Sequence, residues 1–493
     1  GGSPNETSFT AMHEKDIFPS APCHLPSAFF VEALTVSSPE WFYQWQWHQE
    51  LPVTSQEIPP GAILILSDRS YLGTTLMGMF AAEKHSVYFV IPGEKFQKCS
   101  EGEGKFTFTI DTANKGDYEK VLKAVEADNL KVTAVIHLWN YNSVVGNEFD
   151  LLEQNLHQGV YSVLFLSQAL LKVYPHHPIR LFLVTQNAYA TRPGEAICGL
   201  HQSMAATLAQ VLDEENPTIE TQVVDVTPEI SAPEKLADII FQQLKAKPPA
   251  EGIVALRNGQ RFVRTLEKIS LSSHPNNLPL LKSGETCLIT GGTSAVGTEI
   301  ALSLASQAPI NLVLTGRHPL PAKEQWGNLA DSATKQRIQV IEKLERLGAT
   351  VMYQTVDVND VEGMQRLVSN IKARFGKLDA VIHAAGVSGT TFMLKTEEPE
   401  TFAKVLAPKV QGTIILDAVT QNEPLKFFIL LSSVAASKAK WGAGIGDYAV
   451  ANTFLDSYAV YRTQRNASGK SLTINYSLWR DRGMGAILGE SAS

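Results

Sequence analysis

The sequence predicts an α/β protein built from two doubly wound subdomains. The first observation is that short apolar strands are expected at 62–66 and at 287–289, each followed by a turn. The second is that 134–137 and 380–383 share the run Ala-Val-Ile-His, so the second half of the chain repeats the pattern of the first. Repeated strand–helix units of this kind are typical of parallel sheets with helices on both faces.

Length, charge and cysteine content restrict the class of protein. With 493 residues the chain is too long for one hydrophobic core and suits two domains. The net charge of −8 argues against nucleic acid or an anionic membrane as a partner, and the lack of an apolar run of about 18 residues argues against a transmembrane helix. The 4 scattered cysteines have neither disulfide nor metal-ligand spacing, so we expect a cytoplasmic protein without a metal site.

A glycine-rich turn follows the strand at 287–289 and precedes a helix expected at 298–306. Strand, glycine turn and helix are the context of a dinucleotide site, because glycines let the backbone approach the pyrophosphate and the helix N-terminus attracts anions. The match departs from the usual pattern, since Ser294 stands where a middle glycine is expected. The residues expected to bind the dinucleotide are Gly291, Gly292, Thr293, Ser294, Ala295, Val296 and Gly297.

The strand expected at 312–315 ends next to Arg317. An acidic residue there would bind a ribose 2′-hydroxyl, whereas an arginine suits a 2′-phosphate and so favours NADPH over NADH. The alternative is that Arg317 is a solvated surface charge. Further cofactor contacts are expected after the strands at 350–356 and 380–383, the second of which ends in a histidine, His383, that we expect to be structural. These candidates are Asp357, Val358, Ala384, Ala385 and Gly386.

Four polar residues in the second half have the types that carbonyl reduction requires. Tyr448 lies four residues before Asn452, Ser433 follows the apolar run 427–431, and Lys409 lies further upstream. A tyrosine has an ordinary pKa of about 10, so it needs a nearby cation, a hydroxyl that holds the carbonyl and a relay that replaces the proton. Lysine, serine and asparagine supply these groups. Taken alone, Tyr448 would equally suit a packed aromatic residue on a helix.

These motifs, taken in order, resemble the short-chain dehydrogenase/reductase superfamily and, more closely, the ketoreductase domains of modular polyketide synthases. The resemblance covers about residues 280–485. The stretches that carry it are 290–297, 314–317, 356–358, 383–386, 407–412, 431–433, 448–452 and 477–479.

The resemblance implies that Tyr448 is the proton donor and that Ser433 donates a hydrogen bond to the substrate carbonyl. Lys409 and Asn452 would support them, and Lys409 fits the order of this family, in which the lysine precedes the tyrosine. The resemblance also implies NADPH as cofactor and, as substrate, a β-ketoacyl thioester on the phosphopantetheine arm of an acyl carrier protein. Neighbouring synthase domains would be further partners.

The stretch 435–444 upstream of Tyr448 is longer than in familiar members of the family and is expected to be a loop beside the substrate. In this it resembles ketoreductases of synthases without built-in acyltransferases. Ser388 lies where members that deliver the D-hydroxyl carry Leu-Asp-Asp. Trp441 resembles the tryptophan of the class that delivers the L-hydroxyl (A-type), so an L product is expected, although this residue would also suit a loop anchor. Met484 is expected at the mouth of the substrate site or in simple packing.

The first half of the chain lacks the residues to which these roles are given. No run of glycines follows the strand at 62–66. Bulky Trp139 stands where a nucleotide would pass, and Gly159 stands at the position of Lys409. We therefore expect the first half to brace the second and to bind no nucleotide.

The expected organisation is a tag remnant and linker at 1–27, a truncated structural Rossmann-like subdomain at 28–278 and a catalytic Rossmann-like subdomain at 279–493. Two other readings stay open. A nucleotide-sugar epimerase or dehydratase would use a Tyr-x-x-x-Lys pair, and Asn452 in place of that lysine counts against it. A scaffold of the same fold that has lost reduction stays open because of Ser294 in the phosphate loop.

Overall fold

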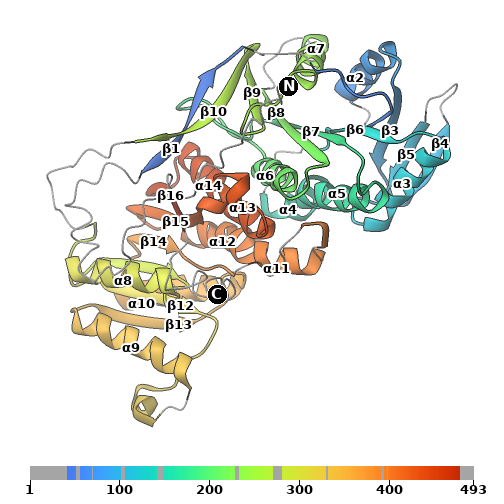
Figure 1. Ribbon diagram of the computed structural model, residues 1–493. Coiled ribbons are helices and arrows are strands. Elements are labelled where there is room, and N and C mark those ends of the chain that lie inside the picture. Colours follow the sequence, from blue (N-terminus) through green and yellow to red (C-terminus); the bar gives the residue numbers. More distant parts are fainter. Residues whose placement is uncertain are drawn as a thin grey trace, which may run out of the picture.

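The structure is a computed structural model. It describes residues 42–477 apart from 52–55, 69, 101–105, 142–147, 228–232, 270–279, 329–330, 388, 390–393 and 397. Within these residues each half of the chain forms its own sheet (Figure 1).

The first half contains a ten-stranded sheet. Its spatial order is β1-β10-β9-β8-β7-β6-β2-β3-β5-β4, in which the strands from β9 across to β5 are parallel and β1, β10 and β4 are antiparallel additions at the two edges. The strands are β1 (Tyr43–Gln49), β2 (Ala62–Leu66), β3 (Ser86–Pro92), β4 (Gln97–Ser100), β5 (Phe106–Ile110), β6 (Val132–His137), β7 (Ile179–Gln186), β8 (Ile219–Val226), β9 (Ile253–Arg257) and β10 (Gln260–Lys268). The helices are α2 (Tyr71–Ala82), α3 (Lys115–Ala127), α4 (Glu148–Leu156), α5 (Ser162–Val173), α6 (Leu200–Glu215) and α7 (Pro233–Leu244).

The second half contains a six-stranded sheet in which every pair is parallel, with the order β13-β12-β11-β14-β15-β16. Its strands are β11 (Thr286–Thr290), β12 (Asn311–Gly316), β13 (Thr350–Thr355), β14 (Ala380–His383), β15 (Phe427–Ser433) and β16 (Lys470–Tyr476). Its helices are α8 (Ala295–Gln307), α9 (Ser332–Arg346), α10 (Val361–Phe375), α11 (Pro399–Lys409), α12 (Gln411–Thr420), α13 (Ala439–Gly442) and α14 (Gly446–Gln464). The strand order reverses between β11 and β14, which is where sheets of this type bind their ligands.

The central strands of both sheets are buried along their whole length. Every residue of β2, β11 and β14 is buried, which suits their Val-, Ile- and Leu-rich sequences. Parallel strands covered by helices on both faces read as continuous apolar runs for this reason. The predicted α/β class with two Rossmann-like, doubly wound sheets is confirmed.

Helices α6 and α14 join the two halves along a face of small side chains. Ser203 Oγ lies 2.8 Å from Ser457 Oγ, and Thr207 Oγ1 lies 2.9 Å from Thr453 Oγ1. Small residues at these positions let the two helix backbones approach closely. Figure 1 shows the two helices side by side between the sheets.

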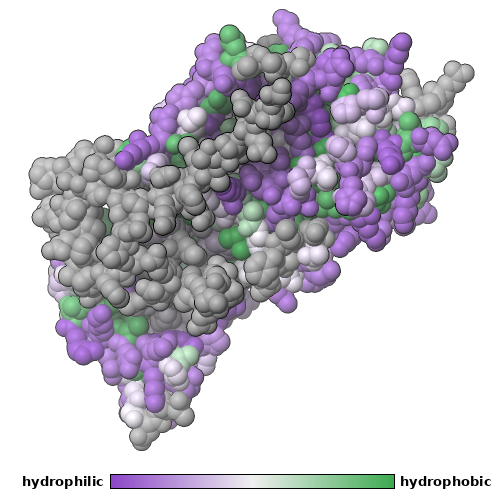
Figure 2. All heavy atoms as spheres, in the orientation of Figure 1, coloured by the Kyte–Doolittle hydropathy of each residue, from purple (hydrophilic) through white to green (hydrophobic). Residues whose placement is uncertain are grey.

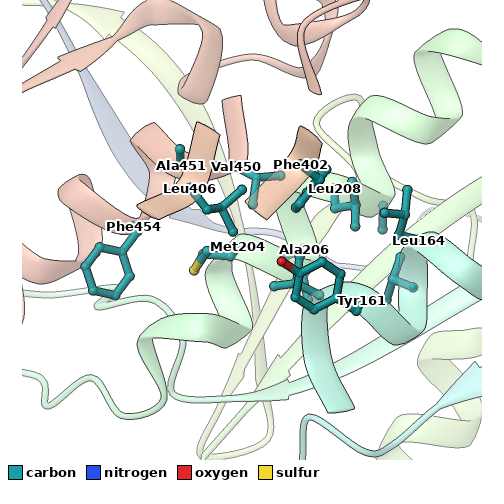
Figure 3. Packing of buried hydrophobic residues seen from close by; sticks show 14 of the residues in the cluster. Tyr161, Leu164, Met204, Ala206, Leu208, Phe402, Leu406, Val450, Ala451 and Phe454 are labelled. Carbon is teal, nitrogen blue, oxygen red and sulfur yellow. The ribbon is translucent and has the colours of Figure 1, made fainter. Parts of the chain in front are cut away.

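The hydrophobic core continues across this boundary (Figure 3). Met204 and Leu208 of α6 face Leu406 of α11 and Val450 of α14, and all four side chains are buried. The first half therefore packs directly against the helices that carry Lys409 and Tyr448.

Two expectations about local structure were wrong. Helix α8 begins at Ala295 and not at 298, because the Oγ atom of Ser294 accepts a hydrogen bond from Gly297 N and so caps the helix early. The stretch 435–444 is not a plain loop, since it contains part of a 3₁₀ turn, Val434–Ala436, and all of α13.

Within the described part of the chain, no helix combines the length and apolarity that crossing a bilayer requires. Figure 2 shows that the described surface on this face is mostly hydrophilic, with small and separate hydrophobic areas.

Candidate functional site

The four candidate catalytic residues meet at the carboxyl end of β15. Ser433 is the last residue of that strand, and Tyr448 lies in the first turn of α14. Lys409 ends α11, and its Nζ atom lies 5.8 Å from the centre of the Tyr448 ring. Asn452 follows Tyr448 by one helical turn, so its side chain lies on the same side of α14.

Burial is the main influence on the phenol of Tyr448. It raises the pKa of this side chain above its ordinary value of 10.0, because the phenolate is poorly solvated. Hydrogen bonding with the side chains of Asn452 and Ser433 acts in the opposite direction. The phenol is therefore protonated at neutral pH, as a proton donor must be.

Lys409 is a buried cation, with 4% of its surface exposed. Its Nζ atom donates a hydrogen bond to Leu431 O at 2.9 Å. Burial lowers the pKa of Lys409 to about 8, against the opposing effect of Asp456. The expected lowering of the Tyr448 pKa by this lysine stays a prediction, since Asn452 and Ser433 are the groups that act on the phenol here.

Asn452 is fully buried, and its side-chain nitrogen and oxygen have different surroundings. Its Nδ2 atom donates to Tyr448 O at 2.7 Å, and its backbone oxygen accepts from Ser432 Oγ at 3.2 Å. Its Oδ1 atom has no hydrogen-bond partner among the described residues. A buried acceptor without a partner next to the tyrosine suits a proton relay.

The sequence reading missed two residues that connect these elements. Asn475, near the end of β16, donates from Nδ2 to Ser433 O at 3.2 Å, to Ser437 Oγ at 3.2 Å and to Asp456 Oδ2 at 2.9 Å. Burial raises the pKa of Asp456 to about 6, although hydrogen bonds from Asn475, Ser432 and Thr473 and the charge of Lys409 lower it. Asp456 lies on α14 four residues after Asn452 and eight after Tyr448. The regular interval of four residues along one helix was the signal that could have identified it.

The glycine-rich turn lies at the point where the strand order reverses. Gly291 has φ 62°, in the left-handed region, and a Cβ atom there would lie 3.0 Å from the backbone of Ala384. A Cβ on Gly297 would lie 2.5 Å from Gly291 O. Ser294 has φ −70° and caps α8, so a glycine is not required at the position where the sequence departs from the usual pattern. The turn and the N-terminus of α8 therefore form a cradle that fits a pyrophosphate.

The other cofactor candidates surround this turn. Arg317 is exposed just beyond β12, and Asp357 is exposed just beyond β13. Asp357 Oδ1 accepts from Asn359 N at 2.9 Å, which fixes a turn there. Val358 is buried and lies against Gly412 of α12. His383 is buried and lies within hydrogen-bond distance of Thr290 Oγ1 and Pro408 O, as expected of a structural residue.

Of the three candidates for substrate contact or stereocontrol, one can be placed. Trp441 is half-buried in α13, and Lys438 Nζ lies 5.9 Å from the centre of its ring. Ser388 and Met484 lie outside the described residues.

The first half carries a larger residue where the second half has Gly386 and a glycine where the second half has Lys409. A Cβ on Gly386 would lie 2.9 Å from Lys409 Cε. Asn140 follows the shared Ala-Val-Ile-His run at the same distance as Gly386 does in the second half. A Cβ on Gly159 would lie 2.6 Å from Asn140 Oδ1. Asn140 thus stands at the position of Gly386 with its side-chain oxygen against Gly159, which stands at the position of Lys409. Trp139 beside Asn140 is 5% exposed.

Each half of the chain matches a known protein-family model. Residues 285–481 match the model described as the KR domain. The second half of this chain belongs to the KR domain family. Residues 61–243 match a model described as beta-ketoacyl synthase-like, N-terminal.

Curated relatives that this chain resembles include polyketide synthases. It is 28% identical over 400 residues to polyketide synthase PksM of Bacillus subtilis (strain 168), which is 81% of this chain and 8% of that protein. It is 33% identical over 327 residues to PksN of the same organism, which is 65% of this chain and 5% of that protein. The chain therefore spans less than a tenth of either relative.

Solved ketoreductases share the fold. An N-terminal ketoreductase from a macrolactin assembly line aligns with a TM-score of 0.75 and 24% identity over 89% of this chain and 83% of that one. A-type ketoreductases from a modular polyketide synthase align with a TM-score of 0.69 and 20% identity over 90% and 84%. KR domains are oxidoreductases that bind a nicotinamide cofactor, and the cradle at the start of α8 fits such a dinucleotide.

Proposed function

We propose that this chain reduces a β-ketoacyl thioester to the β-hydroxyacyl thioester with NADPH as the reductant. The observation that carries the proposal is the meeting of Tyr448, Ser433 and Lys409 at the end of β15, on a sheet whose switch point holds the glycine-rich cradle. The acyl chain would be carried on the phosphopantetheine arm of an acyl carrier protein, with neighbouring synthase domains as partners.

The residues of the chain divide the work of the reaction. Ser433 and Tyr448 hold the keto oxygen between two hydroxyl groups, and Tyr448 gives its proton to that oxygen as the alcohol forms. Lys409 keeps a positive charge beside the phenol, and Asn452 offers its Oδ1 atom to the relay that returns the proton. When bound, the nicotinamide supplies the hydride.

The choice of NADPH over NADH rests on Arg317. Its exposed position just beyond β12 leaves the guanidinium available to a 2′-phosphate, and no acidic residue takes that place. Rates measured with NADPH and with NADH test this choice, and equal efficiency with both would reject it.

The first half would brace the second without binding a nucleotide of its own. The exchange of Gly386 and Lys409 for Asn140 and Gly159, together with buried Trp139, supports this. Titration of the purified chain with NADPH should then give one site per chain. A second site that is lost on substitution within the first half would reject the proposal.

The product would be the L-hydroxyl (A-type) alcohol. Trp441 on α13, upstream of Tyr448, and the lack of a Leu-Asp-Asp run after Gly386 support this choice. Chiral chromatography of the reduced thioester decides between the two products, and a D alcohol would end the assignment.

The test of the whole proposal is NADPH oxidation in the presence of a β-ketoacyl N-acetylcysteamine thioester and of the same acyl group on a carrier protein. Consumption of NADPH with either substrate supports reduction. Binding of NADPH without consumption of any thioester would instead favour a scaffold that retains the fold.

A further inference from the structure

A carboxylate of the first half holds two segments of the second half. Glu215 is the last residue of α6, and its two oxygens accept hydrogen bonds from different backbone groups. Oε1 accepts from Gly444 N at 3.0 Å, and Oε2 accepts from Leu394 N at 2.7 Å. The two amides are 50 residues apart in the sequence, so one side chain fixes their separation in space.

Both segments lie against the first turn of α14, which carries Tyr448. Gly444 has φ 80° and stands between α13 and α14, two residues before the helix begins. Leu394 opens a 3₁₀ turn, Leu394–Thr396, and a Cβ on Gly446 would lie 2.8 Å from its Cδ2 atom. The peptide groups that Glu215 binds are therefore direct neighbours of the helix start.

Other contacts from the first half hold Leu394 and the residue just before α13. Gln168 Nε2 of α5 donates to Leu394 O at 2.8 Å. Lys438, just before α13, forms an ion pair with Glu251 at 3.0 Å. Glu215 differs from these residues because its one carboxylate binds a backbone amide in each of the two segments.

The charge of Glu215 also reaches the residue next to the tyrosine. Asp447 Oδ1 accepts from Tyr448 N at 2.7 Å. Burial and, to a smaller extent, the charge of Glu215 raise the pKa of Asp447 to about 6, although backbone hydrogen bonds lower it. Hydrogen bonds from two backbone amides balance the negative charge of Glu215 at this place.

We propose that Glu215 is a positioning residue for the ketoreductase site, through which the first half sets the orientation of the thioester relative to Tyr448. The inference rests on the proposed function. It assigns a specific task to the first half beyond bracing: Glu215 fixes the distance between the Leu394–Thr396 turn and the end of α13, and these two segments flank the helix turn that delivers the proton. Loss of the bridge is expected to affect thioester binding and product stereochemistry more than cofactor binding.

The test compares Glu215→Gln with Glu214→Gln in the full chain. Glu214 is exposed and precedes Glu215 on the same helix, so it is a matched control. A glutamine at 215 keeps the size of the side chain but offers one acceptor in place of two, so it can bind only one of the two amides. Four quantities are measured: KM and kcat for the thioester, the L to D product ratio, the Kd for NADPH and the midpoint of thermal unfolding.

We expect the KM of Glu215→Gln for the thioester to rise about tenfold, which corresponds to about 1.4 kcal/mol of lost binding, and the minor enantiomer to increase because the thioester is held less firmly in one orientation. The Kd for NADPH and the unfolding midpoint should stay at the values of Glu214→Gln. Equal KM and enantiomer ratios in the two variants would overturn the proposal. So would a fall in NADPH affinity and unfolding midpoint large enough to account for the loss, because that would be a general structural role.

Hydrogen exchange gives a readout that does not depend on turnover. Peptides that contain Gly444 and Leu394 should exchange faster in Glu215→Gln than in Glu214→Gln, because their amides lose the carboxylate. Unchanged exchange overturns the inference even if the wild-type chain reduces thioesters. If exchange is faster in Glu215→Gln but the wild-type chain reduces no thioester, the bridging contacts of Glu215 are supported and the proposed function is rejected.

Discussion

Substitution of Asp456 by asparagine is expected to make the protein more stable and less active. Asp456 holds Asn475, which in turn holds the backbone of Ser433. An asparagine at 456 retains an oxygen that can accept from Asn475, so the substitution removes the charge and keeps the shape. Its effect therefore separates the electrostatic role of this residue from its role in packing.

The gain in stability follows from the raised pKa of the carboxyl group. Burial raises this pKa from the ordinary 3.8 to about 6. The stability that the neutral group contributes is complete below about pH 4 and is lost as the pH rises through about 6. With about 1.4 kcal/mol for each pKa unit, the ionised carboxylate costs the folded state on the order of 3 kcal/mol at neutral pH. This is an upper limit for the gain, because Lys409 loses a favourable neighbour in the variant.

The loss of the Asp456 charge beside Lys409 also explains the expected fall in activity. Burial lowers the pKa of Lys409 to about 8, and Asp456 acts against this effect. Without Asp456 the pKa of Lys409 falls further, so the lysine loses its charge at a lower pH. We expect the alkaline limb of the pH–kcat profile to move to lower pH.

Urea unfolding of the wild type, Asp456→Asn and Asp238→Asn from pH 4 to pH 8 measures the effect. Asp238 is exposed on α7 and serves as the control. The advantage of Asp456→Asn over the wild type should be near zero at pH 4, should grow up to about pH 6 and should then level off. A variant that is less stable than the wild type at pH 8, or an advantage that does not change with pH, would refute the reasoning.

Three further substitutions test the site. Tyr448→Phe should lower kcat about 10²- to 10⁴-fold, the usual value of a general acid, with the Kd for NADPH unchanged; a loss of NADPH binding would contradict this. Arg317→Ala should weaken NADPH binding about 10- to 100-fold, as expected for one charge-assisted contact, and leave NADH binding as it was. Gly386→Ala should displace Lys409 and lower kcat about 10- to 100-fold, since a Cβ would lie 2.9 Å from Lys409 Cε. Gly78→Ala is the control for that change, because a Cβ there meets nothing within 4 Å, and equal activity of the two variants would contradict the prediction.

The elements that the sequence identified correctly are those whose signal is local. The central strands are continuous apolar runs, and the repeated Ala-Val-Ile-His run showed that the two halves share one architecture. Tyr448 and Asn452 belong to one helix, so their spacing alone placed them together. The early start of α8 was missed because the capping role of Ser294 depends on a backbone angle that the residue type does not reveal.

The residues that the sequence did not reveal act through contacts between distant segments. Asn475 reaches Ser433 from a neighbouring strand, 42 residues away in the chain. Glu215 reaches Gly444 across the boundary between the two halves, 229 residues away. Neither belongs to a recognisable motif, so only the packing of the sheets and of α6 against α14 brings them to the site.

Hydride transfer from labelled cofactor is the most direct test of the central claim. NADPH that carries deuterium at the transferred position is mixed with the chain and a β-ketoacyl thioester, and the product is examined by mass spectrometry. One deuterium is expected on the β-carbon of each hydroxyacyl thioester formed by the wild-type protein, whereas Tyr448→Phe should form almost no labelled product in the same reaction time. Product without deuterium, or equal amounts of labelled product from the two proteins in that time, would contradict hydride transfer with Tyr448 as the proton donor.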